Sequence, residues 1–197
     1  MKNKMPLVYL LAMQPELASA FAQAFSDAED VKIAREDFAS FMDGHPEVTG
    51  IVSPANSFGL LTGGLDKALR DYFGKELQDA VRECIKNEWF GEQTLGTSMA
   101  VDIPGAPGKK LLHTPTMRTP SKITDDLIVY SCMRSALMAA IQNDIAAMVI
   151  PAFGGGSGQL PMEVIAHHMR LAWDQIAEWA ENPHVKTFRT TAKVKTE

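Results

Sequence analysis

Two glycine-rich loops constrain this chain most, since each follows a short apolar strand and precedes a helix. The first is Gly50-Ile-Val-Ser-Pro-Ala-Asn56, continuing to Gly63-Gly64-Leu-Asp66, and the second runs from Pro151 through Phe-Gly-Gly-Gly-Ser-Gly to Pro161. Open α/β sheets bind ligands at the carboxyl ends of their strands, where such loops lie. We therefore expect both loops to line one crevice.

The rest of the chain alternates between strand-like and helix-like stretches. Strands are expected at 7–12, 31–34, 51–52, 97–103, 110–116 and 146–151, and helices at 15–25, 38–42, 65–85, 124–143 and 162–180. This alternation predicts a three-layer α/β/α sandwich with a mixed, mostly parallel central sheet. Gly74 is expected to weaken or kink the helix at 65–85. A last strand at 184–190 would complete a single domain over 1–190, leaving 191–197 as a frayed tail.

Composition excludes several classes of function. With 197 residues, of which 46% are hydrophobic, the chain suits one domain with a sizeable core. Its net charge of −5 argues against nucleic-acid binding, and it lacks the apolar run of about 18 residues that spans a bilayer. Cys84 and Cys132 have no metal-binding or redox spacing, so we expect no metal and no cofactor. The short apolar run near the start lacks a cleavage site, so we expect a cytoplasmic, monomeric protein.

The two loops could hold an anion without a cationic side chain. Neither 53–66 nor 152–161 contains Lys or Arg. A phosphate there would be held by backbone N–H groups and by the dipole of the following helix. The alternative is that the glycines serve only tight turns. The second loop fits neither the P-loop pattern nor the dinucleotide fingerprint.

Three polar residues in and near these loops each allow two interpretations. Asn56 could read sugar hydroxyls, or it could bond its own loop backbone. Asp66 could act as a general base that activates water, or could be a helix-start acid favoured by the dipole. Asp37 could accept a hydrogen bond from a purine amino group, or could cap the short helix after it.

Taken together, these residues resemble the macro domain family. Ile51-Val-Ser-Pro-Ala-Asn56 followed by Gly63-Gly64-Leu-Asp66 is similar to that family's strand and catalytic loop, and 151–161 is similar to its phosphate-binding loop. Glu36-Asp37-Phe38 resembles its adenine-contacting segment, and Leu111-Leu-His113-Thr its Ile-His-Thr strand. The resemblance covers about 30–175 in the family's order. It is greatest to the branch with Ser-Pro-Ala-Asn-Ser-Phe-Gly, Pro-Thr-Met-Arg and a Phe-Gly-x-Gly loop.

The resemblance implies binding of ADP-ribose, or of an ADP-ribosylated protein or metabolite, and hydrolysis of an ADP-ribosyl or O-acyl-ADP-ribose linkage. Asn56 would orient the distal ribose and Asp66 would activate the attacking water. Asp37 and the Phe38 backbone N–H would hold adenine. The remaining ligand-binding positions that it implies are Ser53, Ala55, Gly63, Gly64, Phe153, Gly154, Gly155, Gly156, Ser157 and Gly158.

Three positions depart from the family pattern. Ser53 replaces the first Asn of the catalytic loop, Arg70 replaces a His that often follows the Asp, and Gly158 replaces an aromatic residue that presses on the distal ribose. These departures favour a rival hypothesis, in which the chain is a non-catalytic ADP-ribose-binding module. Phosphatase activity on ADP-ribose 1″-phosphate is a further alternative. The sequence leaves open whether 104–108 and 116–121 act as a lid.

Overall fold

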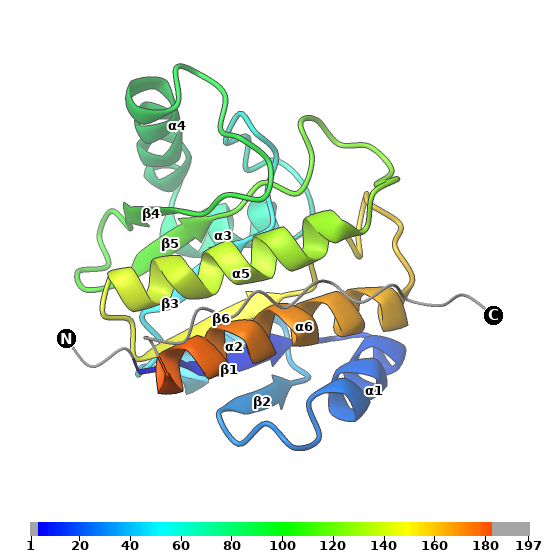
Figure 1. Ribbon diagram of the computed structural model, residues 1–197. Coiled ribbons are helices and arrows are strands. Elements are labelled where there is room, and N and C mark those ends of the chain that lie inside the picture. The colour runs from blue at the N-terminus through cyan, green and yellow to red at the C-terminus, as the bar shows by residue number, and fades with distance from the viewer. Residues whose placement is uncertain (1–3, 183–197) are drawn as a thin grey trace.

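The computed structural model describes residues 4–182. Its strands are β1 (Leu7–Leu11), β2 (Val31–Ala34), β3 (Gly50–Ser53), β4 (Met99–Asp102), β5 (Lys110–His113) and β6 (Ala147–Pro151). They form one six-stranded sheet in the order β2-β1-β6-β3-β5-β4 (Figure 1). All neighbouring strands are parallel except β4, which runs antiparallel to β5. The predicted mixed, mostly parallel sheet is confirmed.

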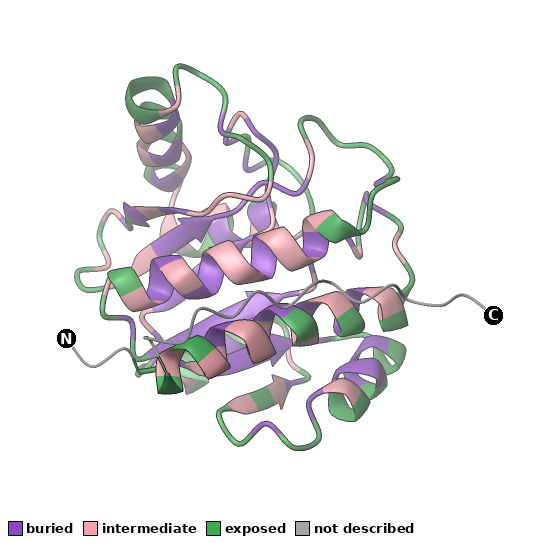
Figure 2. Ribbon diagram, in the orientation of Figure 1, coloured by how far each residue is buried: buried purple, intermediate pink, exposed green. Residues whose placement is uncertain are grey.

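Helices cover both faces of the sheet. They are α1 (Pro15–Ala24), α2 (Phe38–Gly44), α3 (Gly64–Phe73), α4 (Glu76–Glu88), α5 (Leu127–Gln142) and α6 (Met162–Glu181). The buried apolar residues of α1, α5 and α6 belong to one cluster, and those of α2, α3 and α4 belong to a second. The central strands are buried throughout, as Figure 2 shows. The three-layer sandwich predicted from the sequence is therefore confirmed.

Successive side chains of a strand pack into the two clusters in turn, because they point to opposite faces of the sheet. In β3, Ile51 packs with the α2–α4 cluster and Val52 with the α1–α5–α6 cluster. The next residue, Ser53, therefore points to the side that carries α3. This register puts a polar side chain beneath the first turn of α3.

The helix predicted over 65–85 is wrong as a single element, since it is two helices. Gly74 ends α3 with φ +98, and α4 begins at Glu76. A side chain at a φ this positive would be strained, so glycine permits the sharp break here. Leu69 on α3 and Leu77 and Val81 on α4 pack into the same cluster, so the apolar stripe continues across the break.

Two further segments bear on the predictions. α5 begins at Leu127, with Asp126 as its N-cap residue, so the first turn starts later than the expected 124. The predicted last strand at 184–190 and the tail at 191–197 lie outside the described residues. Among residues 4–182, no helix is long and apolar enough to cross a membrane.

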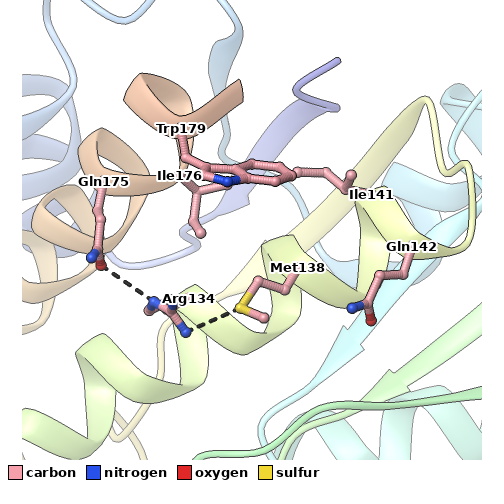
Figure 3. Close-up of a pocket in the computed structure, with 7 residues that line it drawn as sticks. All are labelled: Arg134, Met138, Ile141, Gln142, Gln175, Ile176 and Trp179. Atoms are coloured by element: carbon pink, nitrogen blue, oxygen red, sulfur yellow. Dashed lines mark hydrogen bonds between the residues drawn. The ribbon is translucent and has the colours of Figure 1, made fainter. Parts of the chain in front are cut away.

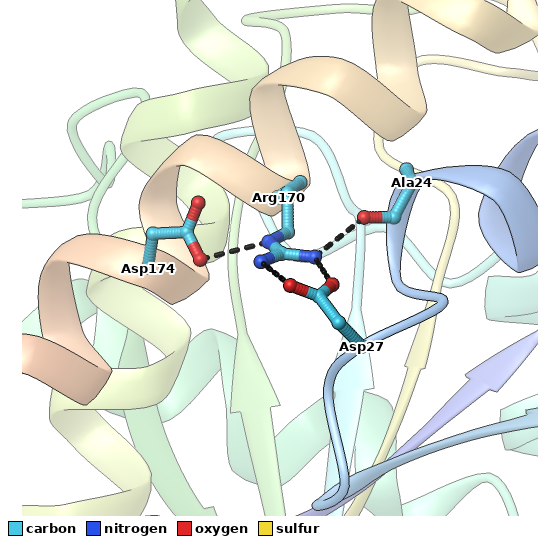
Figure 4. Close-up of polar contacts among 4 residues, drawn as sticks. All are labelled: Ala24, Asp27, Arg170 and Asp174. Carbon is cyan, nitrogen blue, oxygen red and sulfur yellow. Dashed lines mark hydrogen bonds and ion pairs between the residues drawn. The ribbon is translucent and has the colours of Figure 1, made fainter.

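Arg170 on α6 links that helix to the turn after α1 (Figure 4). Its guanidinium donates to both carboxylate oxygens of Asp27, to the Ala24 carbonyl and to Asp174. It also lies 5.5 Å from the Trp173 ring centroid. The hydrogen bonds that Arg170 donates to these carboxylates, to that of Asp27 above all, hold the pKa of Arg170 above its usual range. These contacts join α6 to the turn after α1 and involve no residue of the sheet.

Candidate functional site

Two adjoining hollows lie at the carboxyl ends of the strands. The first, here called the loop hollow, has a volume of about 360 Å³ and is lined by the loops after β3, β5 and β6. The second, the helix hollow, has about 520 Å³ and lies among the end of β1, the start of α2 and one side of α3. Gly64 and Leu65 line both, so the hollows adjoin, and together they are called the crevice below.

The loop after β6 presents unpaired donors to the loop hollow. Gly154 takes φ +84, and its carbonyl accepts from the Leu160 N–H at 3.2 Å. The Gly158 carbonyl accepts from the Ile123 N–H at 3.0 Å. The backbone N–H groups of 155–158 donate to no other group in the described part of the chain. Successive free N–H groups in such a loop form a concave anion-binding site.

The start of α3 adds a second set of donors to the same hollow. Its N-cap residue is Gly63, and no side chain caps the helix. The first backbone N–H groups of a helix have no partner within the helix, and the helix dipole favours negative charge at this end. The loop hollow thus has donors from two sides, although no Lys, Arg or His lines it within residues 4–182.

Among residues 4–182, Asp66 is the one charged side chain that lines the loop hollow. It lies in the first turn of α3 and is only 9% exposed. Ser53, which is fully buried at the end of β3, donates its hydroxyl to Asp66 Oδ1 at 2.6 Å. Burial raises the pKa of Asp66 to about 6, and the hydrogen bond from Ser53 opposes that rise. A carboxylate with a pKa near 6 is ionised at neutral pH and is a stronger base than an exposed aspartate.

Asn56 holds its own loop and still faces the loop hollow. Its Oδ1 accepts from the Phe58 N–H at 3.1 Å and the Leu60 N–H at 3.3 Å, and its Nδ2 donates to the Leu60 carbonyl at 2.9 Å. The interpretation as a residue that bonds its own loop is therefore correct for these contacts. An amide nitrogen has two hydrogens, so one donor remains for a ligand.

The position of Asp37 is compatible with both of the roles considered for it. Its Oδ1 accepts from the N–H groups of Ala39 and Ser40, and its Oδ2 accepts from the Ser40 hydroxyl at 2.7 Å, so it caps α2. These hydrogen bonds, that of the Ser40 hydroxyl first, lower the pKa of Asp37. Asp37 and Phe38 both line the helix hollow. The Phe38 ring meets that of Tyr72 edge-on at 5.6 Å.

The structure brings most of the predicted site residues together. The loop hollow is lined by Ala55, Asn56, Gly63, Gly64, Asp66, Gly154, Gly156, Ser157 and Gly158. Three predicted residues line neither hollow: Ser53, Phe153 and Gly155. Ser53 contacts Asp66 by its hydrogen bond without lining the hollow, and Phe153 is fully buried in the core.

The loop after β5 supplies a wall of the loop hollow; the sequence left open whether its segment 116–121 is a lid and placed none of its residues in the site. Thr116, Met117 and Pro120 line the loop hollow, and Asn56 and Met117 form an isolated parallel bridge. Arg118 donates to Glu92 at 2.7 and 3.0 Å, which ties this loop to the segment after α4. β3 and β5 are neighbouring parallel strands, which brings the loops that follow them together. The other segment considered as a lid, 104–108, joins β4 to the opposite end of β5.

One side of α3 was also missed as lining of the helix hollow. Leu65, Ala68 and Tyr72 face it together with Leu11 and Met13, from the end of β1. The helical spacing of 65, 68 and 72 was a usable signal, since residues three and four apart share a face.

A separate groove of about 380 Å³ lies between α5 and α6 (Figure 3). Arg134 donates there to Gln175 at 3.3 Å and to the Met138 sulfur at 3.1 Å, and Trp179 closes one end. The lining residues include neither a carboxylate nor a nucleophile. This groove therefore lacks the groups that the crevice brings together.

Comparison with known proteins gives one family. The model of the Macro domain family matches residues 52–169, which include both glycine loops. An uncharacterized protein of Aquifex aeolicus is 31% identical over 121 residues, a stretch that covers 60% of this chain and 68% of that protein. An uncharacterized protein of Aeropyrum pernix is 25% identical over 123 residues, covering 62% and 61%.

Solved structures with the same fold are macrodomains. The Oceanobacillus iheyensis macrodomain with MES bound has a TM-score of 0.59 and 24% identity, covering 69% of this chain and 72% of that one. A mutant of the same macrodomain with ADPR has a TM-score of 0.58 and 23% identity, covering 65% and 70%. The macrodomain of Mycobacterium tuberculosis DarG has a TM-score of 0.56 and 21% identity, covering 66% and 84%.

Proposed function

Since this chain belongs to the Macro domain family, we propose that it binds ADP-ribose and hydrolyses an ADP-ribosyl or O-acyl linkage on the distal ribose. The observation that carries the proposal is the loop hollow itself. It combines free backbone N–H groups, those of 156–158, with one buried carboxylate, that of Asp66. A diphosphate needs the first and water activation needs the second.

The diphosphate would lie against the loop after β6 and the start of α3. Both supply N–H donors, and hydrogen bonds from donors to an ionised acceptor are about twice as strong as neutral ones. The ADPR-bound structure with this fold is consistent with such a ligand. An anion held in this way requires no cationic side chain.

Adenine would occupy the helix hollow. Phe38 and Tyr72 supply aromatic surface, and Leu11 and Ala68 supply aliphatic surface. Asp37 can accept one more hydrogen bond, because a carboxylate offers about four lone-pair sites and only three of them are used within α2. It would accept from the adenine amino group, and the free Phe38 N–H would donate to a ring nitrogen.

The chemistry would take place at the end of the loop hollow that holds Asn56 and Asp66. The remaining Asn56 N–H would orient a hydroxyl of the distal ribose, and Asp66 would polarise a water molecule. When the water oxygen bonds to C1″ of an ester-linked ADP-ribose, the C1″–O bond to the acyl group breaks. The carboxylate leaves with the bonding electron pair, and the water proton passes to Asp66.

Calorimetric titration with ADP-ribose, with AMP as the reference ligand, tests the binding. We expect a micromolar dissociation constant, corresponding to about −8 kcal/mol, that AMP does not match. Absence of heat and of competition at millimolar ADP-ribose would refute the proposed site and leave the fold intact.

Release of ADP-ribose from a glutamate-linked substrate tests the turnover. Asp66→Ala should slow it about 100-fold or more, whereas Asp79→Asn, on the exposed side of α4, should not. Unchanged turnover in Asp66→Ala would rule out this residue as the base.

A non-catalytic ADP-ribose-binding module is the second candidate. Arg70 stands where the family often has His, and no side chain fits at Gly158, because an added Cβ would lie 2.6 Å from the Gly154 carbonyl oxygen. The distal ribose thus has no ring pressing on it from this loop, which weakens the positioning that turnover needs. Saturable ADP-ribose binding without cleavage of ester, arginine-linked or 1″-phosphate substrates would establish this candidate.

A further inference from the structure

The charged residues that line the crevice are all acidic. In the loop hollow the charged side chain is Asp66, and in the helix hollow they are Asp37 and Asp71. Neither hollow is lined by Lys, Arg or His in the described part of the chain. A ligand anion in this crevice is therefore balanced only where backbone N–H groups reach it.

Cations on α3 and on the loop after β5 contact carboxylates other than that of Asp66. Lys67 pairs with Asp71, and Arg70 lies 3.9 Å from the same carboxylate. Arg118, on the loop after β5, makes a two-bond contact with Glu92. None of these groups contributes to the pKa of Asp66, which is set by burial and by Ser53.

The residue paired with Ser53 in the sheet adds no charge either. His113 is the strand partner of Ser53 on β5 and is fully buried. Burial lowers the pKa of His113 to about 3, and its Nδ1 lies 2.6 Å from Gln93 Oε1. It is neutral at physiological pH. Among residues 4–182, the Asp66 side chain has one hydrogen-bond partner, the neutral hydroxyl of Ser53.

We infer that this site selects its substrate by charge: it accepts ADP-ribose whose distal ribose carries an uncharged substituent, such as a carboxylic ester, and discriminates against a 1″-phosphate. The inference rests on the proposed function, since it assigns Asp66 to the distal ribose. A phosphomonoester carries a charge of about −1.5 to −2 at pH 7. Placed beside a buried carboxylate with no cation to neutralise it, such a group is repelled strongly, because the protein interior screens charge poorly.

In the proposed pose the diphosphate takes up the free N–H groups of 156–158 and of the start of α3, so these donors are no longer open to a substituent that meets Asp66. Substituents on the distal ribose lie beyond that loop. The site would therefore accept the diphosphate beside the loop after β6 but not a third phosphate beside Asp66. This favours ester hydrolysis over the phosphatase alternative.

Calorimetry at pH 8 with ADP-ribose and ADP-ribose 1″-phosphate tests the inference on the wild-type protein, Asp66→Asn and Asp79→Asn. We expect the 1″-phosphate to bind at least about tenfold more weakly than ADP-ribose to the wild-type protein and to Asp79→Asn. In Asp66→Asn the two affinities should agree within about threefold, since the repelling charge is gone.

The outcomes separate this inference from the proposed function. Equal wild-type affinities, a gap that persists in Asp66→Asn, or release of inorganic phosphate from the 1″-phosphate would overturn charge selection while ADP-ribose binding stood. If ADP-ribose itself failed to bind, the proposed function would fall and the inference with it.

Discussion

At the scale of single residues, the Asp66 carboxyl that we propose as the base also carries a cost to stability. This carboxyl has a pKa of about 6 in the folded protein, against an ordinary value of 3.8 for an exposed aspartate. Between these two pH values the folded state binds the proton that the unfolded state has released. Stability therefore falls as pH rises from about 4 to 6, and the loss is complete above pH 6.

Asp66→Asn should consequently stabilise the protein, and more so at high pH. The two pKa values imply a gain at pH 8 that exceeds the gain at pH 5 by about 1.4 kcal/mol. Ser53 keeps an acceptor, because the new amide oxygen takes the place of Oδ1. Urea unfolding of both proteins at pH 5 and pH 8 measures the difference. A gain that is the same at both pH values, or larger at pH 5, would contradict the raised pKa.

Ser53 is expected to tune Asp66. Its hydroxyl lowers the pKa of Asp66 against the effect of burial, so Ser53→Ala should raise that pKa further. The carboxyl carbon resonance of Asp66, followed by NMR from pH 4 to pH 9, reports this without requiring turnover. If turnover occurs, the acidic limb of its pH profile should move to higher pH by the same amount. Ser98→Ala, which removes a hydroxyl bonded to Thr114, is the control and should leave the titration unchanged.

At the scale of elements, the loop after β6 depends on its last glycine. A Cβ at Gly158 would lie 2.6 Å from the Gly154 carbonyl oxygen and 2.7 Å from Ile123 Cδ1. The first of these is backbone, so it cannot move without reshaping the turn. The free N–H groups of 155–158 are held in position by this close approach.

Gly158→Ala should therefore weaken ADP-ribose binding by about tenfold or more, because it displaces the donors from the diphosphate. Gly44→Ala is the matched control, since nothing lies within 4 Å of a Cβ added there. Calorimetry gives both affinities, and circular dichroism shows whether each variant is folded. Wild-type affinity in a folded Gly158→Ala would exclude this loop as the diphosphate site.

Element identities followed from the sequence, but their ends and contacts did not. The apolar stripe from Leu65 to Ile85 has helical spacing throughout, and it remains continuous because α3 and α4 bury the same face. Only the conformation of Gly74 separates them, and a glycine inside a helical pattern predicts a weak point rather than a break. Asn56 shows the same limit of sequence analysis. An asparagine that bonds its own loop, as this one does at 58 and 60, looks the same in the sequence as one that binds a ligand.

At the scale of the whole molecule, strand order decides what the sequence could reveal. Both glycine loops were predicted to meet, and they do, because β3 and β6 are neighbouring parallel strands. The wall from the loop after β5 depends on Arg118 meeting Glu92, 26 residues away. A surface contact between two loops has no periodicity, so it could not be predicted from the sequence.

The outer layer provides a prediction about stability alone. Arg170 is 21% exposed at its side chain and joins α6 to Asp27 and the Ala24 carbonyl (Figure 4). Arg170→Met keeps much of the apolar contact with Trp173 and Phe25 but leaves the carbonyl and Asp27 without their donor. Since a hydrogen bond to a charged group contributes about 1.5–3 kcal/mol and exposure reduces this, we expect a loss of about 1–2 kcal/mol.

Urea unfolding should show that loss at unchanged ADP-ribose affinity, because the contact lies in the layer of α1 and α6, whereas the crevice is lined by α2, α3 and the loops. Lys86→Met is the matched control: its ammonium lies 3.9 Å from Glu83 and is 74% exposed, so its removal should change stability by no more than about 0.5 kcal/mol. Equal losses in the two variants would mean that the Arg170 contacts stabilise no more than an exposed ion pair. A loss of ligand affinity in Arg170→Met would mean instead that the outer layer positions the loop after β6 through α6, which begins directly after it.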